Sequence, residues 1–98
     1  MAFKIVLTQP ARKDLLFTMD WYDEQQQNLG YKFYQDYVAA RQYLILNPLF
    51  FRKGTHGFYE LKLSTFPYLI IYDIVDSTVV IVAVFNTSKN PGKKPSKF

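Results

Sequence analysis

The fold of this 98-residue chain is decided by two apolar stretches, Tyr68-Leu69-Ile70-Ile71-Tyr72-Asp73-Ile74-Val75 and Val79-Val80-Ile81-Val82-Ala83-Val84-Phe85. Both are rich in β-branched and aromatic residues, a pattern typical of strands buried on both faces of a sheet. The short link at Asp76-Ser77 favours an antiparallel hairpin. Residues 58–63 alternate polar and apolar side chains and reach the first stretch through a turn at 64–67. The sequence therefore predicts a three-stranded antiparallel meander.

The N-terminal half predicts one strand and two helices. Phe3–Leu7 is a short strand whose alternate residues place apolar side chains on one face. Thr8 suits the N-cap of a helix that begins near Pro10, where the missing N–H of proline costs nothing. Two apolar helical faces follow at steps of three and four residues: Ala11, Leu15, Met19 and Tyr22, and then Leu29, Phe33, Tyr37, Ala40 and Leu44.

Two interruptions bound these helices. Asn28-Leu29-Gly30 separates them, and Asn47-Pro48 ends the second, because the residue before a proline disfavours helical torsions. A short turn between two amphipathic helices predicts an antiparallel helix hairpin. The expected architecture is α+β: a strand, the helix hairpin and the meander, with both helices packed on one face of an antiparallel sheet.

Composition narrows the functions open to the chain. Its length fits a single domain, which we place at 1–90, followed by a basic flexible tail at 91–98. The chain has no cysteine and one histidine, which excludes disulfide scaffolds, thiol nucleophiles and multi-histidine metal sites, so we expect neither metal nor cofactor. No apolar run approaches the roughly 20 residues that cross a bilayer, and the start does not resemble a signal peptide. We therefore expect a cytoplasmic protein without a membrane partner.

The net charge of +4 comes entirely from the second half of the chain. Residues 1–51 carry five basic and five acidic side chains, whereas residues 52–98 carry seven basic and three acidic ones. This excess suits an acidic partner near the C-terminal end, either a nucleic acid or an acidic protein. A solvated tail that keeps the protein soluble explains the lysines after Phe85 equally well.

RNA cleavage is an enzymatic reaction that the family resemblance given below implies as one possibility for this chain. It needs a base for the 2′-hydroxyl proton, a cation for the phosphorane charge and an acid for the leaving oxygen. Side chains of suitable chemistry are Arg52, Lys53, His56, Lys62, Tyr72, Asn86 and Lys89. Structural roles compete with this interpretation: His56 as a surface loop residue, Tyr72 as a sheet aromatic and Asn86 as a cap at a strand end.

Other side chains suit a protein partner better than a reaction. Lys62 alternates with Leu61 and Leu63, so it should lie on the sheet face away from the helices, where it meets a phosphate or an acidic partner, or pairs with Glu60. The candidates for partner binding are Trp21, Tyr34, Tyr59, Lys62 and Lys89. The acidic residues of the first helix are predicted to form a solvated face: Asp14, Asp20, Asp23 and Glu24.

Several short motifs, taken in order and spacing, resemble the RelE/ParE toxins of bacterial type II toxin–antitoxin systems. They are Pro10-Ala11 with Asp14-Leu15, Trp21-Tyr22, Leu29-Gly30 with Phe33, Asn47-Pro48, Phe66-Pro67-Tyr68, Tyr72 and Val84-Phe85-Asn86-Thr87-Ser88-Lys89-Asn90-Pro91. Trp21-Tyr22 and the Leu29-Gly30-Phe33 pattern resemble the ParE-like branch.

The resemblance implies a growth-inhibiting toxin, of the kind found in plasmid-stabilisation systems, that a cognate antitoxin neutralises. The antitoxin would fold its C-terminal segment along the helix hairpin and across the open sheet face. The free toxin would either bind DNA gyrase without catalysis, as ParE toxins do, or cleave ribosome-bound mRNA, as RelE toxins do. Whether the chain is an enzyme depends on which target it has.

Two departures from the family pattern bear on the target. Members commonly have a histidine where this chain has Asn86, and many have an arginine where it has Tyr59. Lys89 lies close to a further position that is often arginine. Because RNA-cleaving relatives would use the histidine and the arginines, we favour gyrase as the target. A third hypothesis is a non-toxic binding module that only binds antitoxin.

Overall fold

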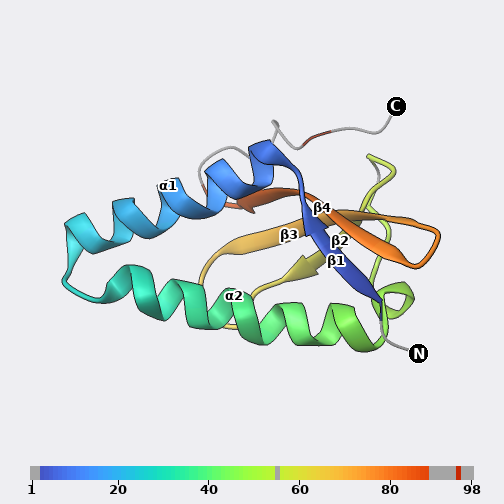
Figure 1. The fold of residues 1–98 in the computed structure, drawn as a ribbon. Helices are drawn as coiled ribbons and strands as arrows, with labels where there is room; N and C mark the ends of the chain where they lie inside the picture. The colour runs from blue at the N-terminus through green and yellow to red at the C-terminus, as the bar shows by residue number, and fades with distance from the viewer. Residues whose placement is uncertain (1–2, 55, 89–94, 96–98) are drawn as a thin grey trace.

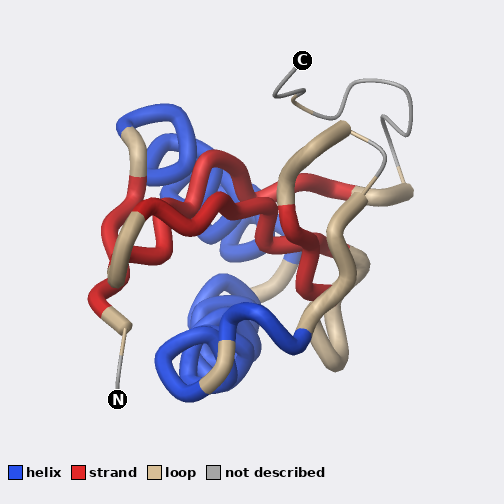
Figure 2. The backbone as a smooth tube through the Cα atoms, turned by 90° about the vertical axis from the view of Figure 1, so that its right-hand side faces the viewer, coloured by secondary structure: helices blue, strands red, loops and turns tan. Residues whose placement is uncertain are grey.

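The computed structural model describes residues 3–54, 56–88 and 95, in which a helix hairpin lies against a four-stranded sheet (Figure 1). The elements are β1 (Lys4–Leu7), α1 (Gln9–Gln25), α2 (Leu29–Leu46), the 3-10 turn η1 (Pro48–Phe50), β2 (Tyr59–Lys62), β3 (Tyr68–Val75) and β4 (Thr78–Asn86). Figure 2 shows the two helices (blue) beside the strands (red), and the predicted α+β architecture is confirmed. The predicted tail at 91–98 lies outside the described residues except for Pro95.

The sheet is mixed, with the strand order β1-β4-β3-β2. The predicted antiparallel meander of β2, β3 and β4 is confirmed. β1, however, pairs with β4 in parallel, with Ile5 opposite Val79 and Leu7 opposite Ile81. The expectation of a wholly antiparallel sheet is therefore wrong for β1. Parallel pairing requires a long crossover connection between the two strands. Here the connection from β1 to β4 contains the helix hairpin, β2 and β3.

A bulge in β4 meets the start of α1. Val82 is the extra residue, because Ile81 and Ala83 pair with consecutive residues of β3. The Thr8 N–H donates to the Ile81 carbonyl at 3.0 Å, and the Thr8 hydroxyl donates to the Val82 carbonyl at 3.3 Å. The same hydroxyl oxygen accepts the Ala11 N–H at 3.2 Å, which confirms the predicted N-cap.

The core lies between the helices and the sheet. Most of the predicted helix faces are buried, namely Ala11, Leu15, Phe33, Tyr37, Ala40 and Leu44. Met19, Tyr22 and Leu29 are only partly buried, whereas Thr18 and Gly30, which were not predicted, are buried. β3 is buried on both faces, as predicted, since the consecutive residues Ile70, Ile71 and Tyr72 are each at most 1% exposed. Within the described part of the chain, no helix is long and apolar enough to cross a membrane.

Gly30 permits the close approach of the two helices at the hairpin turn. A Cβ atom at this position would lie 2.3 Å from the Met19 carbonyl oxygen and 2.8 Å from the Asp23 carboxylate. That carboxylate accepts the Gly30 N–H at 2.8 Å. Asp23 is exposed, as are Asp20 and Glu24, but it also caps α2, a role that the sequence analysis did not assign.

Candidate partner-binding surfaces

Four aromatic side chains close the hairpin end of the molecule: Tyr22, Phe33, Phe66 and Tyr68. Tyr22 meets Phe66 edge-on with the centroids 4.9 Å apart, and Phe33 meets Tyr68 edge-on at 5.0 Å, whereas Tyr22 and Phe33 stack at 5.8 Å. Burial raises the pKa of Tyr22 to about 12, and the neighbouring Tyr68 adds to the shift. Packing alone therefore accounts for several of the motif positions.

Asp36 ties the β2–β3 turn to α2. Its Oδ2 atom accepts the N–H groups of Thr65 at 3.0 Å and of Phe66 at 2.9 Å. These two bonds to a charged acceptor hold the turn against the helix, and with it the Phe66 ring in the aromatic cluster. The hairpin end is thus fixed by both apolar and polar contacts.

Tyr72, a catalytic candidate, lies inside the core. Its side chain is 0% exposed, and its hydroxyl donates a 2.6 Å hydrogen bond to the Pro48 carbonyl. Burial raises the pKa of Tyr72 far above its usual value, and the nearby Tyr59 adds to the shift. The Tyr59 ring stacks on it, with the centroids 5.4 Å apart. The hydroxyl therefore has no open side from which a substrate could take its proton.

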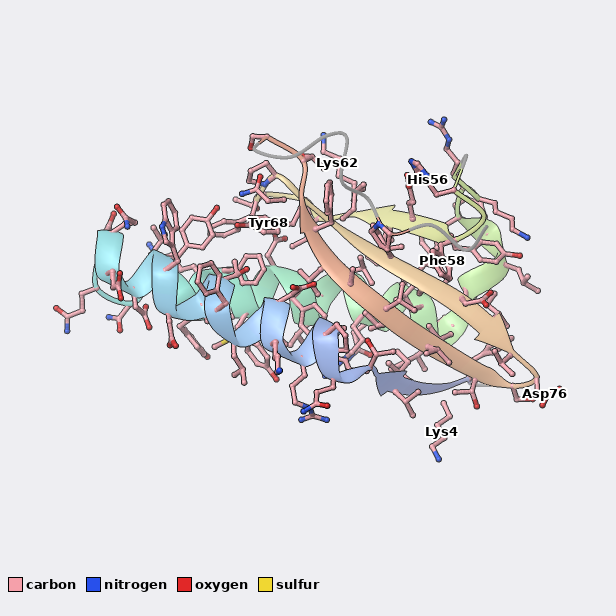
Figure 3. All side chains as sticks on the ribbon, turned by 90° about the horizontal axis from the view of Figure 1, so that it is seen from above. Lys4, His56, Phe58, Lys62, Tyr68 and Asp76 are labelled. Atoms are coloured by element: carbon pink, nitrogen blue, oxygen red, sulfur yellow. The ribbon has the colours of Figure 1, made fainter. Side chains whose placement is uncertain are left out.

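The other catalytic candidates before β3 are spread along β2. Residues 52–54 run antiparallel beside the start of this strand, and the Arg52 carbonyl accepts the Glu60 N–H at 2.9 Å. His56 lies in the turn that follows, whereas Lys62 lies at the far end of the strand, and Figure 3 shows the two well apart. The Lys53 ammonium lies 5.5 Å from the centroid of the Tyr59 ring, so it is engaged in a cation–π contact.

Lys62 and Asn86 point to opposite faces of the sheet. Asn86 is opposite Tyr68 on the helix-facing side, and its Nδ2 donates to the Tyr68 hydroxyl at 3.1 Å. Lys62 is opposite Leu69, which follows Tyr68 and therefore points to the other face of the sheet. Lys62 is exposed, as predicted. Lys89 lies outside the described residues. The catalytic candidates that are described do not converge on one point, and no group of three metal-ligating side chains occurs among them or elsewhere in the described part.

A groove opens between α2, η1 and β2, and we call it the α2–β2 groove. It has a volume of about 360 Å³ and is lined by Ala40, Tyr43, Leu46, Asn47, Phe50, Phe51, Leu61, Lys62 and Ser64. Four large apolar side chains in or beside it are strongly exposed: Tyr43 (61%), Leu46 (74%), Leu49 (61%) and Phe50 (76%). Such a concentration of apolar surface on a small protein indicates an interaction site.

The groove borders an open strand edge. β2 is the outermost strand on one side of the sheet. The Leu63 N–H donates to the Tyr68 carbonyl at 3.0 Å, so the backbone groups of Lys62, one residue earlier, point away from β3. No described residue forms a hydrogen bond with them. An extended segment of a partner can pair with this edge while its side chains enter the groove.

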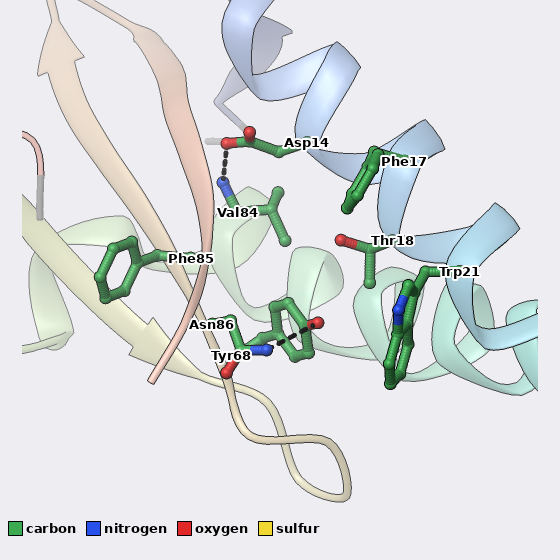
Figure 4. A pocket seen from close by; sticks show the side chains of 8 residues that line it. All are labelled: Asp14, Phe17, Thr18, Trp21, Tyr68, Val84, Phe85 and Asn86. Carbon is green, nitrogen blue, oxygen red and sulfur yellow. Dashed lines mark hydrogen bonds between the residues drawn. The ribbon is translucent and has the colours of Figure 1, made fainter. Parts of the chain in front are cut away.

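A second hollow, the α1–β4 cavity, lies between α1 and the end of β4 (Figure 4). It has a volume of about 310 Å³ and is lined by Asp14, Phe17, Thr18, Trp21, Tyr68, Val84, Phe85 and Asn86. Asp14 is partly buried, and its Oδ2 accepts the Val84 N–H at 3.1 Å. Burial raises the pKa of the Asp14 carboxyl, and this hydrogen bond opposes the shift. The prediction that Asp14 belongs to a solvated helix face is therefore wrong, because β4 packs against it.

Three of the five predicted partner-binding residues line a hollow. Trp21 lines the α1–β4 cavity, Lys62 lines the α2–β2 groove, and Tyr34 lines a hollow of about 370 Å³ on α2. Tyr59 instead stacks on a buried ring. Lys89 lies outside the described residues, so its predicted partner contact stays a prediction.

Sequence reasoning missed Leu46, Phe50 and Asp14. The first two had a usable signal, since they are apolar residues on either side of the helix-ending Asn47-Pro48 and belong to no predicted buried face. Asp14 follows Ala11 by three positions, which places it close to the buried face of α1.

Residues 5–91 match the family model described as the ParE toxin of the type II toxin–antitoxin system parDE. The chain belongs to the ParE toxin family. Among solved structures, it is similar to a chain of the chromosomal ParDE toxin–antitoxin system from P. aeruginosa, with a TM-score of 0.75 and 20% identity over 87% of this chain and 96% of that chain. At this identity the likeness shows the shared ParE fold. No curated protein sequence matches the chain significantly.

Proposed function

We propose that this chain is the toxin of a type II toxin–antitoxin pair, that its antitoxin neutralises it by binding the α2–β2 groove, and that the free toxin inhibits DNA gyrase. The observation that supports the docking site is the exposure of Tyr43, Leu46 and Phe50, each more than 60% accessible around one groove. Membership of the ParE family supplies the antitoxin as the occupant.

The expected antitoxin segment is apolar on one side and acidic on the other. Apolar side chains fill the groove, and backbone groups pair with the open edge at Lys62. The positive excess of the second half of the chain, with Arg52, Lys53 and Lys62 around β2, favours acidic residues on the flanks of that segment. Charge complementarity of this kind raises the association rate and selects the correct partner.

Gyrase is favoured over RNA as the target because the groups that RNA cleavage needs are dispersed. An acid, a base and a cation would have to lie within hydrogen-bonding reach, about 3 Å, of the reacting atoms. Tyr72 is in the core, and Lys62 and Asn86 point to opposite sheet faces. Inhibition of a protein target needs a complementary surface and no converging catalytic groups, so the dispersal of these described side chains does not count against it.

The antitoxin site is tested by co-expression with the protein encoded beside this chain. We expect Phe50→Asp to weaken that complex by about tenfold or more, because a buried carboxylate would replace an apolar anchor. Leu16→Asp is the matched control: Leu16 is also exposed (56%) but lies on α1 and lines neither hollow. Equal loss in both variants, or no loss with Phe50→Asp, would contradict the site.

The target is tested by inducing the toxin in bacteria and following thymidine and amino-acid incorporation together. Loss of DNA synthesis first, with gyrase supercoiling blocked by the purified chain, is the expected result. An early stop in protein synthesis with continuing DNA synthesis would identify an mRNA endonuclease instead. Unchanged growth would leave the chain as a binding module for antitoxin.

A further inference from the structure

The α1–β4 cavity is not explained by packing of the fold. Its walls include the rings of Phe17, Trp21 and Tyr68, and Phe17 is 71% exposed at the rim. Figure 4 shows these rings on one side of β4, whereas the Phe85 ring points to the other side. Three aromatic side chains line an opening of about 310 Å³, which is large enough to hold one large side chain.

Two oxygen acceptors open into this aromatic compartment from α1. Asp14 uses one carboxylate oxygen for the Val84 N–H, and no described residue donates to the other. Thr18 is only 6% exposed, yet its hydroxyl forms no hydrogen bond with any described residue, and Figure 4 shows it directed towards the cavity. The two side chains are four residues apart and therefore lie one above the other on the same face of the helix.

The charge of the lining selects the sign of the ligand. Asp14 is the ionisable acid among the described lining residues, and none of them is basic. A carboxylate beside aromatic faces repels phosphates and attracts a cation, which also interacts favourably with the ring faces. A guanidinium fits better than an ammonium, because it is planar, stacks on rings and donates to two separate acceptors at once.

We propose that the α1–β4 cavity binds the guanidinium group of an arginine side chain presented by the antitoxin. This assignment rests on the proposed function for the identity of the partner. The guanidinium would donate to Asp14 and Thr18 and lie between Phe17 and Trp21. A toxin of net charge +4 would thus hold one basic residue of a generally acidic partner at a specific point.

The cavity is within reach of the α2–β2 groove. Lys62, at the groove, is opposite Leu69, which is opposite Phe85 at the cavity. Two strand spacings separate Lys62 from Phe85, about 10 Å, a distance that about three extended residues span. An antitoxin segment that pairs with the edge of β2 therefore lies about 10 Å from the strand that lines the cavity, and its chain passes the end of β4 to present an arginine on the helix-facing side.

The free chain gives the first test, with Nα-acetyl-arginine amide as the probe. In NMR spectra of the labelled protein, we expect the Val84 N–H, the Trp21 indole N–H and the Asn86 side-chain amide to shift and saturate. The citrulline analogue, which is neutral and nearly isosteric, should bind about fivefold more weakly or worse. Asp14→Asn, which still accepts from Val84, should abolish that difference, and Asp20→Asn should preserve it. Equal binding of the citrulline or a norleucine analogue would overturn the proposal.

The complex gives the second test, by a double-mutant cycle. Each arginine of the antitoxin is replaced by glutamine, alone and together with Asp14→Asn in the toxin. One arginine should lose about tenfold in affinity in the parent toxin and almost nothing in the variant. If no arginine couples to Asp14 although Phe50→Asp still disrupts the complex, the cavity assignment fails and the proposed function stands. If no complex forms at all, the proposed function fails and the antitoxin is ruled out as the source of the arginine. Arginine binding by the free chain would in that case still support the cavity as a guanidinium site.

Discussion

Apolar side chains are buried at one end of the helical layer and exposed at the other. Phe33, near the start of α2, is 0% exposed inside the aromatic cluster, whereas Leu46 and Phe50, at its far end, are 74% and 76% exposed. Burial of apolar surface stabilises a fold by about 25 cal/mol per Å². The hairpin end therefore contributes to the stability of the free chain, whereas the groove end contributes little until a partner covers it. The high aromatic content thus serves folding at the hairpin end and, in the proposed function, partner binding at the groove end.

The sharpest test of this contrast pairs Phe33→Ala with Phe50→Ala. Phe33→Ala should lower the free energy of unfolding by about 3–5 kcal/mol, because it leaves a cavity among three other rings. Phe50→Ala should cost less than about 1 kcal/mol, since most of this side chain already faces solvent. Urea unfolding followed by circular dichroism measures both. Similar losses in the two variants would show that the groove end is part of the folding core.

Gly30→Ala should give the next largest effect and would confirm that the hairpin end is tightly closed. Alanine normally stabilises a helix by about 1 kcal/mol relative to glycine. Here the added Cβ would meet the Met19 carbonyl at 2.3 Å, so we expect a net loss of about 1–3 kcal/mol. Lys32→Ala, at an exposed position two residues later, is the control and should change the thermal midpoint little. A stabilised Gly30→Ala protein would mean that the helices can separate freely.

The parts of the fold that the sequence predicted correctly have local causes. The Thr8 cap, the buried face with Phe33 and Tyr37 and the doubly buried β3 each follow from patterns within a few residues. The parallel pairing of β1 and the bulge at Val82 were not predicted. They depend on contacts such as that between Thr8 and Val82, which are 74 positions apart, and no periodicity encodes such a register.

The candidate surfaces were predicted less completely, for related reasons. Trp21 and Lys62 were chosen because they did not fit a buried face, and both line hollows. Asp14 was assigned to solvent because of its charge, although its spacing from Ala11 places it near the core. The exposure of Leu46 depends on where η1 directs the chain after α2, which the helical pattern does not determine.

Two buried tyrosines of the core differ in the hydrogen bonding of their hydroxyl groups. Tyr72→Phe should cost about 1–2 kcal/mol, because it leaves the buried Pro48 carbonyl without its donor. The Tyr37 hydroxyl is buried, and no described residue forms a hydrogen bond of good geometry with it, although the Arg41 guanidinium lies 5.6 Å from the ring centroid and opposes the rise in the pKa of Tyr37 that burial causes. Tyr37→Phe should therefore be neutral or stabilise by up to about 1 kcal/mol. Equal costs in urea unfolding would contradict this assignment of partners.

The smallest expected effect on stability concerns Asp14, which lines the α1–β4 cavity. Burial raises its pKa in the folded state above the ordinary 3.8, so the folded chain binds this proton more tightly than the unfolded chain. Its contribution to stability is therefore fully present below that ordinary value and is lost as the pH rises through the folded pKa. Asp14→Asn should match or exceed the parent in stability at neutral pH, with the difference closing below about pH 4. Urea midpoints across that range measure it, with Asp20→Asn, at an exposed position of the same helix, as the control. A parent that gains on Asp14→Asn as the pH rises would mean that the Val84 hydrogen bond outweighs desolvation.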